Sequence, residues 1–479
     1  MTQVIGNLAM PGNPRYQPKE LVPYFGYDNF MNGLAEIEIA NLQVLAEIGV
    51  MPHEDISLLT PDILARLRVI TTSEVDVVER ETKHDVRAWV RIAQEITGPK
   101  LGRWMHALLT SYDAIDSGRI VQYTRAHQQV LLPTIKEVLL LFAELTRRFA
   151  GELQIGRTHG QHALPITVGF WFATILSRVL YCAQQMDFYS NALVGKISGA
   201  VGAYNAQVGL GITERCGQIT FEERLLKRVG IKPGPVSTQI LQPEPLAFYL
   251  YSCNMLSAAL AQFGRDGRSL MRTEIAEIAE AFESQQVGSS TMAHKRNPLT
   301  FENTEGQWIR TKNEFGKVQD TLISEHQRDL VASCVMRDFP AIPVNVQYQL
   351  NTLRRQTDDG TPFLRRLTVD PHACQTNFKR SAGVILAEPL YLALQMAGYE
   401  GDAHELVNRT LIPGAKEHGK TLMEELVIVA EDNEDLQAAL DRIPPTVLGL
   451  FSHPESYIGS ATEKALQIAD QAEAFVASV

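Results

Sequence analysis

The segment from Gly288 to Pro298 carries the residue types best suited to chemistry in this sequence. It begins with a glycine and two serines, continues through Lys295, Arg296 and Asn297, and ends with a proline that suits the start of a helix. Hydroxyls, a cation and the free amides of a helix N-terminus together can hold a carboxylate and stabilise negative charge that develops on it. For this segment taken alone, a solvated polar turn is the alternative.

Two further groups of polar side chains are candidates for the same chemistry. Glu302 lies five residues after Asn297, just inside the expected helix, where it could face the loop or a histidine from another segment. His159 and His162 are three positions apart and could share a metal ion. Gly160 between them favours a loop instead, and we expect no metal there.

Long helices must position these residues. Apolar side chains recur at intervals of three and four over 34–48 and 135–149, and the ranges 168–193 and 246–271 contain no proline and few glycines. Strand signals are sparse. Because helices of this length must bury their apolar faces against each other, we predict an all-α fold with a long central helical bundle.

The length and composition agree with a multidomain globular protein. The chain has 479 residues, of which 45% are hydrophobic and 21% are charged, so it can form a sizeable core. Breaks near 116–118 and 368–371 divide it into three expected helical domains, an N-terminal domain (1–117), a central long-helix domain (118–370) and a C-terminal domain (371–479).

Charge and cysteine content narrow the class of partner. The net charge of −11 argues against binding to nucleic acid or to an anionic membrane, although a local basic cluster could still bind a small anion. The uncharged stretch 245–263 is interrupted by polar residues, so we expect a buried helix and not a membrane span.

No targeting segment is visible at the N-terminus. A cytoplasmic location fits the five scattered cysteines, Cys182, Cys216, Cys253, Cys334 and Cys374.

Several common enzyme motifs are incomplete. The segment 288–295 lacks the ending of a phosphate-binding loop, and Gly209–Leu210–Gly211 lacks the third glycine of a dinucleotide turn. His404–Glu405 begins like a zinc-protease helix, but position 408 is asparagine. These chemistries are therefore not expected.

The segment Gly288–Pro298, which reads GSSTMAHKRNP, resembles the signature loop of the fumarase/aspartase superfamily. Members of that superfamily cleave a C–N or C–O bond of a succinyl compound and mostly release fumarate. Within it the chain resembles the adenylosuccinate lyases from about residue 15 into the C-terminal domain. The further matching segments are Arg15–Tyr16, Thr82–Val86, Leu109–Asp113, Arg157–Gln161, Lys196–Gly202, Thr238–Gln239 and Arg328 with Ser333 and Arg337.

The resemblance implies roles for four catalytic residues. Ser289 is the base that removes a proton beside a carboxylate, and His159 is the acid that protonates the departing nitrogen. Glu302 matches the carboxylate that hydrogen-bonds this histidine and sets its proton affinity. His84 matches a second histidine segment near the phosphate and succinyl ends of the substrate.

The resemblance also implies a set of substrate-binding residues. Lys295 and Asn297 would hold a substrate carboxylate, and the arginines would hold a nucleotide phosphate, which suits guanidinium forks. The full set is Arg15, Tyr16, Lys83, Asp85, Thr110, Ser111, Thr158, Gln239, Lys295, Asn297, Arg328, Ser333 and Arg337.

For the whole molecule, the resemblance implies a fumarase/aspartase-like fold and association of the chains into a homotetramer. Each active site of that homotetramer would contain segments from three subunits. The implied reaction releases fumarate from adenylosuccinate, and from the succinylated aminoimidazole carboxamide ribotide (SAICAR) of purine synthesis. No metal and no organic cofactor are implied.

Five positions depart from the family pattern. Ala293 and His162 stand where relatives usually have proline, Lys83 stands for arginine, and Pro243 stands where relatives tend to have arginine. A tryptophan expected shortly before Arg328 is missing. None of these positions is a proposed proton-transfer residue, and all lie around substrate-contacting segments. They therefore bear on the leaving group more than on the type of reaction.

Two alternatives follow. One is a related lyase acting on a different substituted succinate, or a carboxymuconate cycloisomerase, which would have little use for the phosphate-binding arginines. The other is a non-catalytic helical assembly protein, since some relatives became structural proteins of the lens. Intact Ser289, His159, Lys295 and Glu302 argue against the second alternative.

Overall fold

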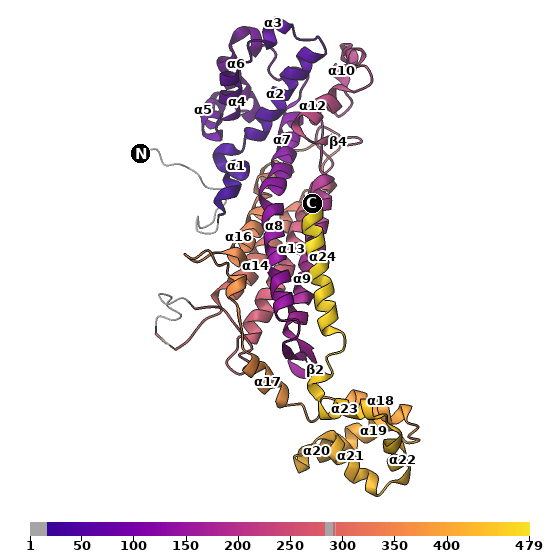
Figure 1. Cartoon of the computed structure of the whole chain (residues 1–479). Coiled ribbons are helices and arrows are strands. Elements are labelled where there is room, and N and C mark those ends of the chain that lie inside the picture. Colours follow the sequence, from indigo (N-terminus) through magenta and orange to yellow (C-terminus); the bar gives the residue numbers. More distant parts are fainter. Residues whose placement is uncertain (1–16, 283–290, 293) are drawn as a thin grey trace. The chain divides into compact units, whose positions relative to one another are not determined.

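The computed structural model describes residues 17–282, 291–292 and 294–479 (Figure 1). Helices make up 67% of the structure and strands 5%, so the predicted all-α class is confirmed. In this described part of the chain, no helix is both long and apolar enough to cross a membrane. The uncharged stretch 245–263 lies within a long helix, as expected.

The helices follow one another with few interruptions. In chain order the α-helices are α1 (Val22–Phe25), α2 (Asn32–Glu47), α3 (His53–Ile56), α4 (Pro61–Arg68), α5 (Thr72–Thr82), α6 (Asp85–Gly102), α7 (Ser111–Ala126), α8 (Leu132–Arg148), α9 (Val168–Asn191), α10 (Asn205–Gly209), α11 (Ile212–Cys216), α12 (Phe221–Val229), α13 (Glu244–Leu270), α14 (Leu299–Asp320), α15 (Val331–Val335), α16 (Ala341–Arg354), α17 (Pro371–Lys379), α18 (Ala387–Met396), α19 (Ala403–Leu406), α20 (Ile412–His418), α21 (Leu422–Glu431), α22 (Glu434–Arg442), α23 (Pro445–Ser452) and α24 (Ala461–Ser478).

Short elements connect these helices. The 3-10 turns are η2 (Lys19–Leu21), η3 (Tyr27–Asn29), η5 (Met336–Asp338), η6 (Leu364–Arg366) and η8 (Pro454–Ser456), and the π turns are η4 (His127–Leu131) and η7 (Val407–Leu411). The strands are β1 (Leu153–Thr158), β2 (Gln161–Thr167), β3 (Val194–Gly195), β4 (Lys232–Pro233), β5 (Ile278–Ala279) and β6 (Thr368–Val369). They form three two-stranded sheets, β1–β2, β3–β4 and β5–β6.

The chain folds into two compact units, each assembled from three stretches of sequence. The first unit comprises Met1–Glu137, Tyr181–Ala261 and Asn303–Thr352. The second comprises Val138–Leu180, Gln262–Glu302 and Leu353–Val479. The division of the sequence into domains at 117 and 370 stays a prediction.

Within the first unit, α2 and α7 pack through two glycines. A Cβ atom on Gly33 would lie 2.2 Å from the carbonyl oxygen of Gly118, and one on Gly118 would lie 2.5 Å from the carbonyl carbon of Gly33. The two backbones therefore touch, and only glycine fits on either side. Just after the end of α2, Gly49 takes a positive φ of 69°.

The second unit has an aromatic core that includes residues of four helices. Phe263 of α13 packs edge-to-face on Phe142 of α8 and on Phe301 of α14, with ring centroids 5.0 and 5.3 Å apart, and Phe172 of α9 lies 6.5 Å away. A separate cluster of buried apolar side chains lies among α18–α22. The aromatic contacts fix the start of α14, which follows the signature loop.

The antiparallel hairpin β1–β2 was not predicted from the sequence. Its two-residue turn consists of His159 and Gly160, which both have positive φ angles of 55° and 77°. This is the backbone that a tight hairpin turn requires, and Gly160 adopts it without strain. The expected loop around Gly160 is therefore present as the tip of a hairpin.

We predict that Gly118→Ala destabilises the chain by about 3 kcal/mol, because the new methyl group clashes with backbone atoms that cannot move independently. The gain of up to about 1 kcal/mol in helix propensity does not offset this clash. Chemical denaturation measures the change in free energy of unfolding.

The matched control is Gly316→Ala in α14, where an added Cβ meets no atom of the chain within 4 Å. The control should leave the free energy of unfolding unchanged or raise it by up to about 1 kcal/mol. Equal stability of Gly118→Ala and wild type would contradict the close packing of α2 on α7.

Candidate active site

In the first unit, two predicted site segments meet at the beginnings of α6 and α7. His84 is the N-cap of α6, and its Nδ1 accepts a hydrogen bond from the amide of Arg87 at 3.3 Å. Because Nδ1 accepts, the neutral imidazole carries its proton on Nε2, which lies 3.4 Å from the hydroxyl oxygen of Ser111. Ser111 is the first residue of α7, and Thr110 is its N-cap. The structure thus brings His84, Thr110 and Ser111 together.

A second group surrounds the guanidinium of Arg328. Its Nη1 donates to Oε1 of Gln239 at 2.7 Å, and its carbon Cζ lies 3.5 Å from the ring centroid of Tyr112. The hydroxyl of Tyr112 is 3.1 Å from that of Ser333 in α15. The Tyr112 ring therefore supports the Arg328 cation while its hydroxyl contacts Ser333.

Arg337 joins the two groups. Its Nη2 donates to Oδ2 of Asp85 at 2.9 Å, and its guanidinium lies 5.4 Å from the ring centroid of Phe30. Asp85 follows His84 at the start of α6. Lys83 has a left-handed backbone with φ 52° and an exposed side chain at the end of α5.

These contacts make one polar cluster from segments far apart in the sequence. It contains the predicted residues His84, Asp85, Thr110, Ser111, Gln239, Arg328, Ser333 and Arg337. Two guanidinium groups beside a serine hydroxyl and a helix N-terminus form a suitable receptor for a phosphate-sized anion. Sequence reasoning missed the role of Tyr112, although this residue stands inside one of the matching segments.

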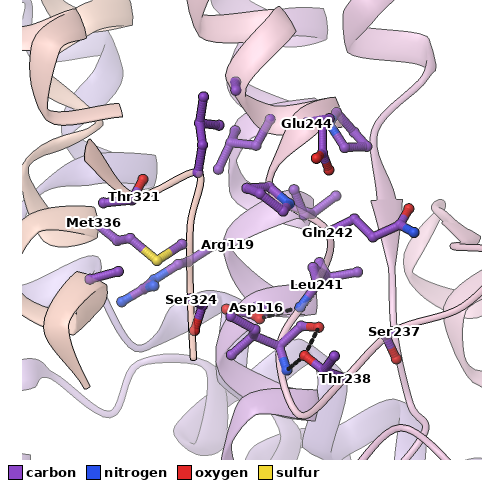
Figure 2. A pocket seen from close by; sticks show the side chains of 18 of the residues that line it. Asp116, Arg119, Ser237, Thr238, Leu241, Gln242, Glu244, Thr321, Ser324 and Met336 are labelled. Carbon is purple, nitrogen blue, oxygen red and sulfur yellow. Dashed lines mark hydrogen bonds between the residues drawn. The ribbon is translucent and has the colours of Figure 1, made fainter. Parts of the chain in front are cut away.

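A cavity of about 350 Å³ lies beside the segment that carries Gln239 (Figure 2). Its lining includes Thr238 and Ile240 but not Gln239, and its charged groups are Asp116 and Arg119 of α7 and Glu244 of α13. Oδ2 of Asp116 accepts from the amide of Leu241 at 3.0 Å, while Oδ1 has no hydrogen-bond partner among the described residues. Burial raises the pKa of Asp116, although Arg119 and the Leu241 amide act in the opposite direction.

In the second unit, the hairpin β1–β2 carries Thr158 and His159 at its exposed tip. The neighbouring Arg157 donates to both carboxylate oxygens of Glu277, at 2.6 and 3.0 Å. Glu277 is fully buried and also accepts from Gln154 and from Asn377, each at 2.9 Å. This buried carboxylate fixes the hairpin directly behind its tip.

His162 has a different role from His159. Its Nδ1 is 2.8 Å from the hydroxyl oxygen of Ser381, and burial together with the nearby Arg157 lowers its pKa. Over the described ranges of the chain, no three His, Cys, Asp or Glu side chains gather in a way that could hold a metal ion.

The start of α14 also rests on a buried carboxylate. Glu280 accepts from the amides of Thr300 and Phe301 at 3.1 and 2.8 Å, and burial raises its pKa although these amides lower it. Glu302 lies in the first turn of α14 and is exposed. Among the described residues, no hydrogen bond or ion pair joins Glu302 to His159 within one chain.

The predicted carboxylate-binding residues Lys295 and Asn297 lie just before α14. They line a hollow of about 1100 Å³ whose other charged residues are Arg265, Arg268, Arg272 and Arg296. This concentration of cations suits an anion, in a chain whose net charge is negative. The predicted residues Ser289, Arg15 and Tyr16, and the departure at Ala293, lie outside the described residues.

Comparison with known proteins identifies the family of this chain. A model of the lyase family matches residues 37–311. An adenylosuccinate lyase of Pyrococcus abyssi is 30% identical over 459 residues, which cover 95% of each chain. One from Pyrococcus horikoshii is 29% identical and covers 97% of this chain and 98% of its own.

Solved structures agree in fold. A 3-carboxy-cis,cis-muconate lactonizing enzyme from Pseudomonas putida superimposes with a TM-score of 0.78 at 20% identity, and covers 96% of this chain and 98% of its own. A fumarate lyase from a Mesorhizobium species superimposes with the same TM-score at 21% identity, and covers 95% and 98%. The chain is an enzyme of the C–N lyase type, and it belongs with the adenylosuccinate lyases in the lyase family of the fumarase/aspartase superfamily.

Proposed function

We propose that the chain releases fumarate from adenylosuccinate to give AMP, and from SAICAR to give the corresponding carboxamide ribotide. The observation that carries this proposal is the cluster of Arg328, Ser333 and Arg337 at the starts of α6 and α7, because a substrate without a phosphate has little use for it. The near full-length similarity to adenylosuccinate lyases supports the same substrate.

In the proposed reaction, Ser289 removes the proton from the carbon beside one succinyl carboxylate. The resulting charge is held on that carboxylate by Lys295, Asn297 and nearby amides. The C–N bond then breaks, His159 protonates the departing nitrogen, and fumarate leaves. Glu302 would hydrogen-bond His159 and set its proton affinity.

His84 and Gln239 fit this scheme through their contacts. His84 presents Nε2–H toward the Ser111 oxygen, which leaves the hydroxyl hydrogen of Ser111 as a donor beside the amides of α7. The side-chain oxygen of Gln239 accepts a hydrogen bond from Arg328, and its NH₂ group would donate to the substrate. Arg15, Tyr16, Lys83, Asp85 and Thr158 are included in the proposed substrate contacts from family resemblance.

We also propose a cytoplasmic homotetramer in which Ser289 and His159 of one active site come from different subunits. An exposed aromatic surface in the first unit supports association. It consists of Tyr181 and Phe188 of α9 with Phe248, Tyr251 and Met255 of α13, which are between 41% and 63% exposed. Tyr189 stacks on Phe248 at 5.3 Å and so holds the two helices side by side. An apolar surface of this kind on a single chain is typical of an interface.

The direct test is an absorbance assay with purified protein and adenylosuccinate. We expect turnover of adenylosuccinate, and none of a succinyl amine without phosphate or of carboxymuconate. Absence of turnover at saturating adenylosuccinate would reject the purine assignment. Turnover of a phosphate-free substrate instead would favour the related lyase or the cycloisomerase.

We predict that Arg337→Gln raises KM for adenylosuccinate by about 10- to 100-fold, because it removes a charge-assisted contact to the phosphate. The value of kcat should change much less, since the phosphate is remote from the bond that breaks. Arg91→Gln is the matched control, because Arg91 is also 48% exposed and paired with a carboxylate. A similar KM in both variants would show that Arg337 does not contact the substrate.

We predict that Ser289→Ala loses about 10²- to 10⁴-fold in kcat and still binds substrate, because the hydroxyl acts in the transition state. Comparable activity in this variant would place the base elsewhere. His159→Gln should be similarly inactive.

Mixing these two inactive variants, followed by subunit exchange, tests the shared site. If Ser289 and His159 come from different subunits, roughly a quarter of the sites in randomly mixed oligomers regain both groups. Recovery of activity is therefore expected, with unmixed samples as controls. No recovery after exchange demonstrated by mass spectrometry would assign both residues to the same subunit.

A further inference from the structure

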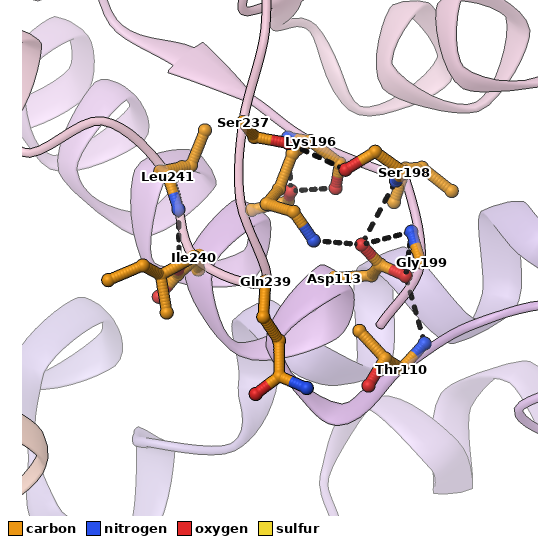
Figure 3. Close-up of polar contacts among 12 residues, drawn as sticks. Thr110, Asp113, Lys196, Ser198, Gly199, Ser237, Gln239, Ile240 and Leu241 are labelled. Atoms are coloured by element: carbon orange, nitrogen blue, oxygen red, sulfur yellow. Dashed lines mark hydrogen bonds and ion pairs between the residues drawn. The ribbon is translucent and has the colours of Figure 1, made fainter. Parts of the chain in front are cut away.

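The start of α7 contains a fully buried ion pair between Asp113 and Lys196 (Figure 3). The side chains of these two residues are 0% and 1% exposed. The Asp113 carboxylate also accepts from the amides of Ser198 at 3.1 Å, Gly199 at 3.2 Å and Thr110 at 2.8 Å. One carboxylate thus holds the amides of two separate segments, 198–199 and the N-cap of α7.

A buried ion pair is a poor way to gain stability alone. Removing both charges from water costs several kcal/mol per ion, and an apolar pair of similar volume often gives equal or greater stability. The geometry here offers another reason to keep the charge. A carboxylate has lone pairs on two oxygens and can accept from N–H groups through both, whereas the neutral side chain of asparagine has only one accepting atom.

The same network reaches the segment that carries Gln239. The hydroxyl oxygens of Ser198 and Ser237 are 2.6 Å apart. Gly202, with φ 74°, lies so close that a Cβ atom on it would be 2.0 Å from the carbonyl oxygen of Ser237. The segment 237–239 is therefore held from the side of the loop 198–202, and Figure 3 shows Gln239 extending from it toward Thr110.

Lys196 is itself fixed by α7. Its amide donates to the hydroxyl of Ser117 at 2.9 Å, and that hydroxyl donates to the carbonyl of Lys196 at 2.7 Å. Ser117 lies one turn after Asp113, so side chain and backbone of Lys196 are bound to the same helix. The ammonium group therefore cannot turn away from the carboxylate without breaking these bonds.

We propose that Asp113 and Lys196 are positioning residues for the active site. Through them, the three segments 110–111, 198–202 and 237–239 keep one fixed geometry, which sets the places of the Ser111 hydroxyl and the Gln239 amide relative to bound substrate. The catalytic consequence rests on the proposed function, whereas the joint ordering of the three segments does not.

The decisive comparison is between Lys196→Met and the double variant Lys196→Met/Asp113→Asn. The single variant leaves a buried carboxylate without its cation, and we expect lower thermal stability with kcat/KM reduced by about 10²-fold. In the double variant no unpaired buried charge remains, so thermal stability should recover. Its kcat/KM should stay low, because the side-chain nitrogen of asparagine cannot accept a hydrogen bond from the backbone N–H groups that the carboxylate holds. A double variant with wild-type kcat/KM would show that the pair is only structural.

A milder variant covers the case in which Lys196→Met does not fold. Ser198→Ala removes the link to Ser237, and we expect KM for adenylosuccinate to rise about tenfold with a folded protein. Ser252→Ala is the control, because Ser252 is a buried serine whose hydroxyl donates to the Tyr249 carbonyl of its own helix. Equal KM values in both serine variants would overturn the link.

Amide hydrogen exchange separates this proposal from the proposed function. In Lys196→Met, the rate of backbone amide exchange should rise about tenfold in all three peptides that cover 109–112, 197–204 and 236–241. The rate in α2 should stay unchanged. A rise confined to one of the three peptides would overturn joint positioning. If the wild-type protein is inactive on adenylosuccinate while Lys196→Met still shows this exchange pattern, the proposed substrate is rejected and the positioning role is kept.

Discussion

The geometry of this protein depends on carboxylates that are buried and held by several hydrogen bonds. A charge in a low-dielectric interior must be fully bonded, and the groups that bond it are thereby fixed. Asp113 does this at the start of α7, Glu277 behind the hairpin β1–β2, and Glu280 at the start of α14. Each of these three places lies next to residues with a proposed role in binding or catalysis.

This arrangement explains how short, irregular segments can be rigid in a protein made of long helices. The helices supply the apolar packing, as in the contact of Gly33 with Gly118 and the ring cluster around Phe263. Their ends supply free amides, which need acceptors. Where an acidic side chain from a neighbouring segment provides the acceptor, as Glu280 does for α14, the helix end and that segment become one structural unit.

Much of the fold followed from the sequence, because the apolar spacing of 34–48 and the proline-free ranges 168–193 and 246–271 can form only long helices. The hairpin β1–β2 did not, since its strands lack sustained alternation and depend on the tertiary contact of Arg157 with Glu277. Motif reasoning pointed to Arg328, Ser333 and Arg337, but it could not predict that Tyr112 contacts both Arg328 and Ser333, because these contacts exist only in the folded chain.

The departures from the family pattern can now be placed relative to the polar cluster. Pro243 lines the cavity beside the segment 237–241, with Leu241 and Pro245, and Gln239 is not part of that lining. Position 243, where relatives tend to have arginine, is therefore part of the cavity wall. Asp116 and Arg119 supply charge to the cavity from α7, and Asp116 holds the amide of Leu241. The segment 237–241 is therefore held to α7 through Asp116, and Pro243 belongs to the wall of the same cavity.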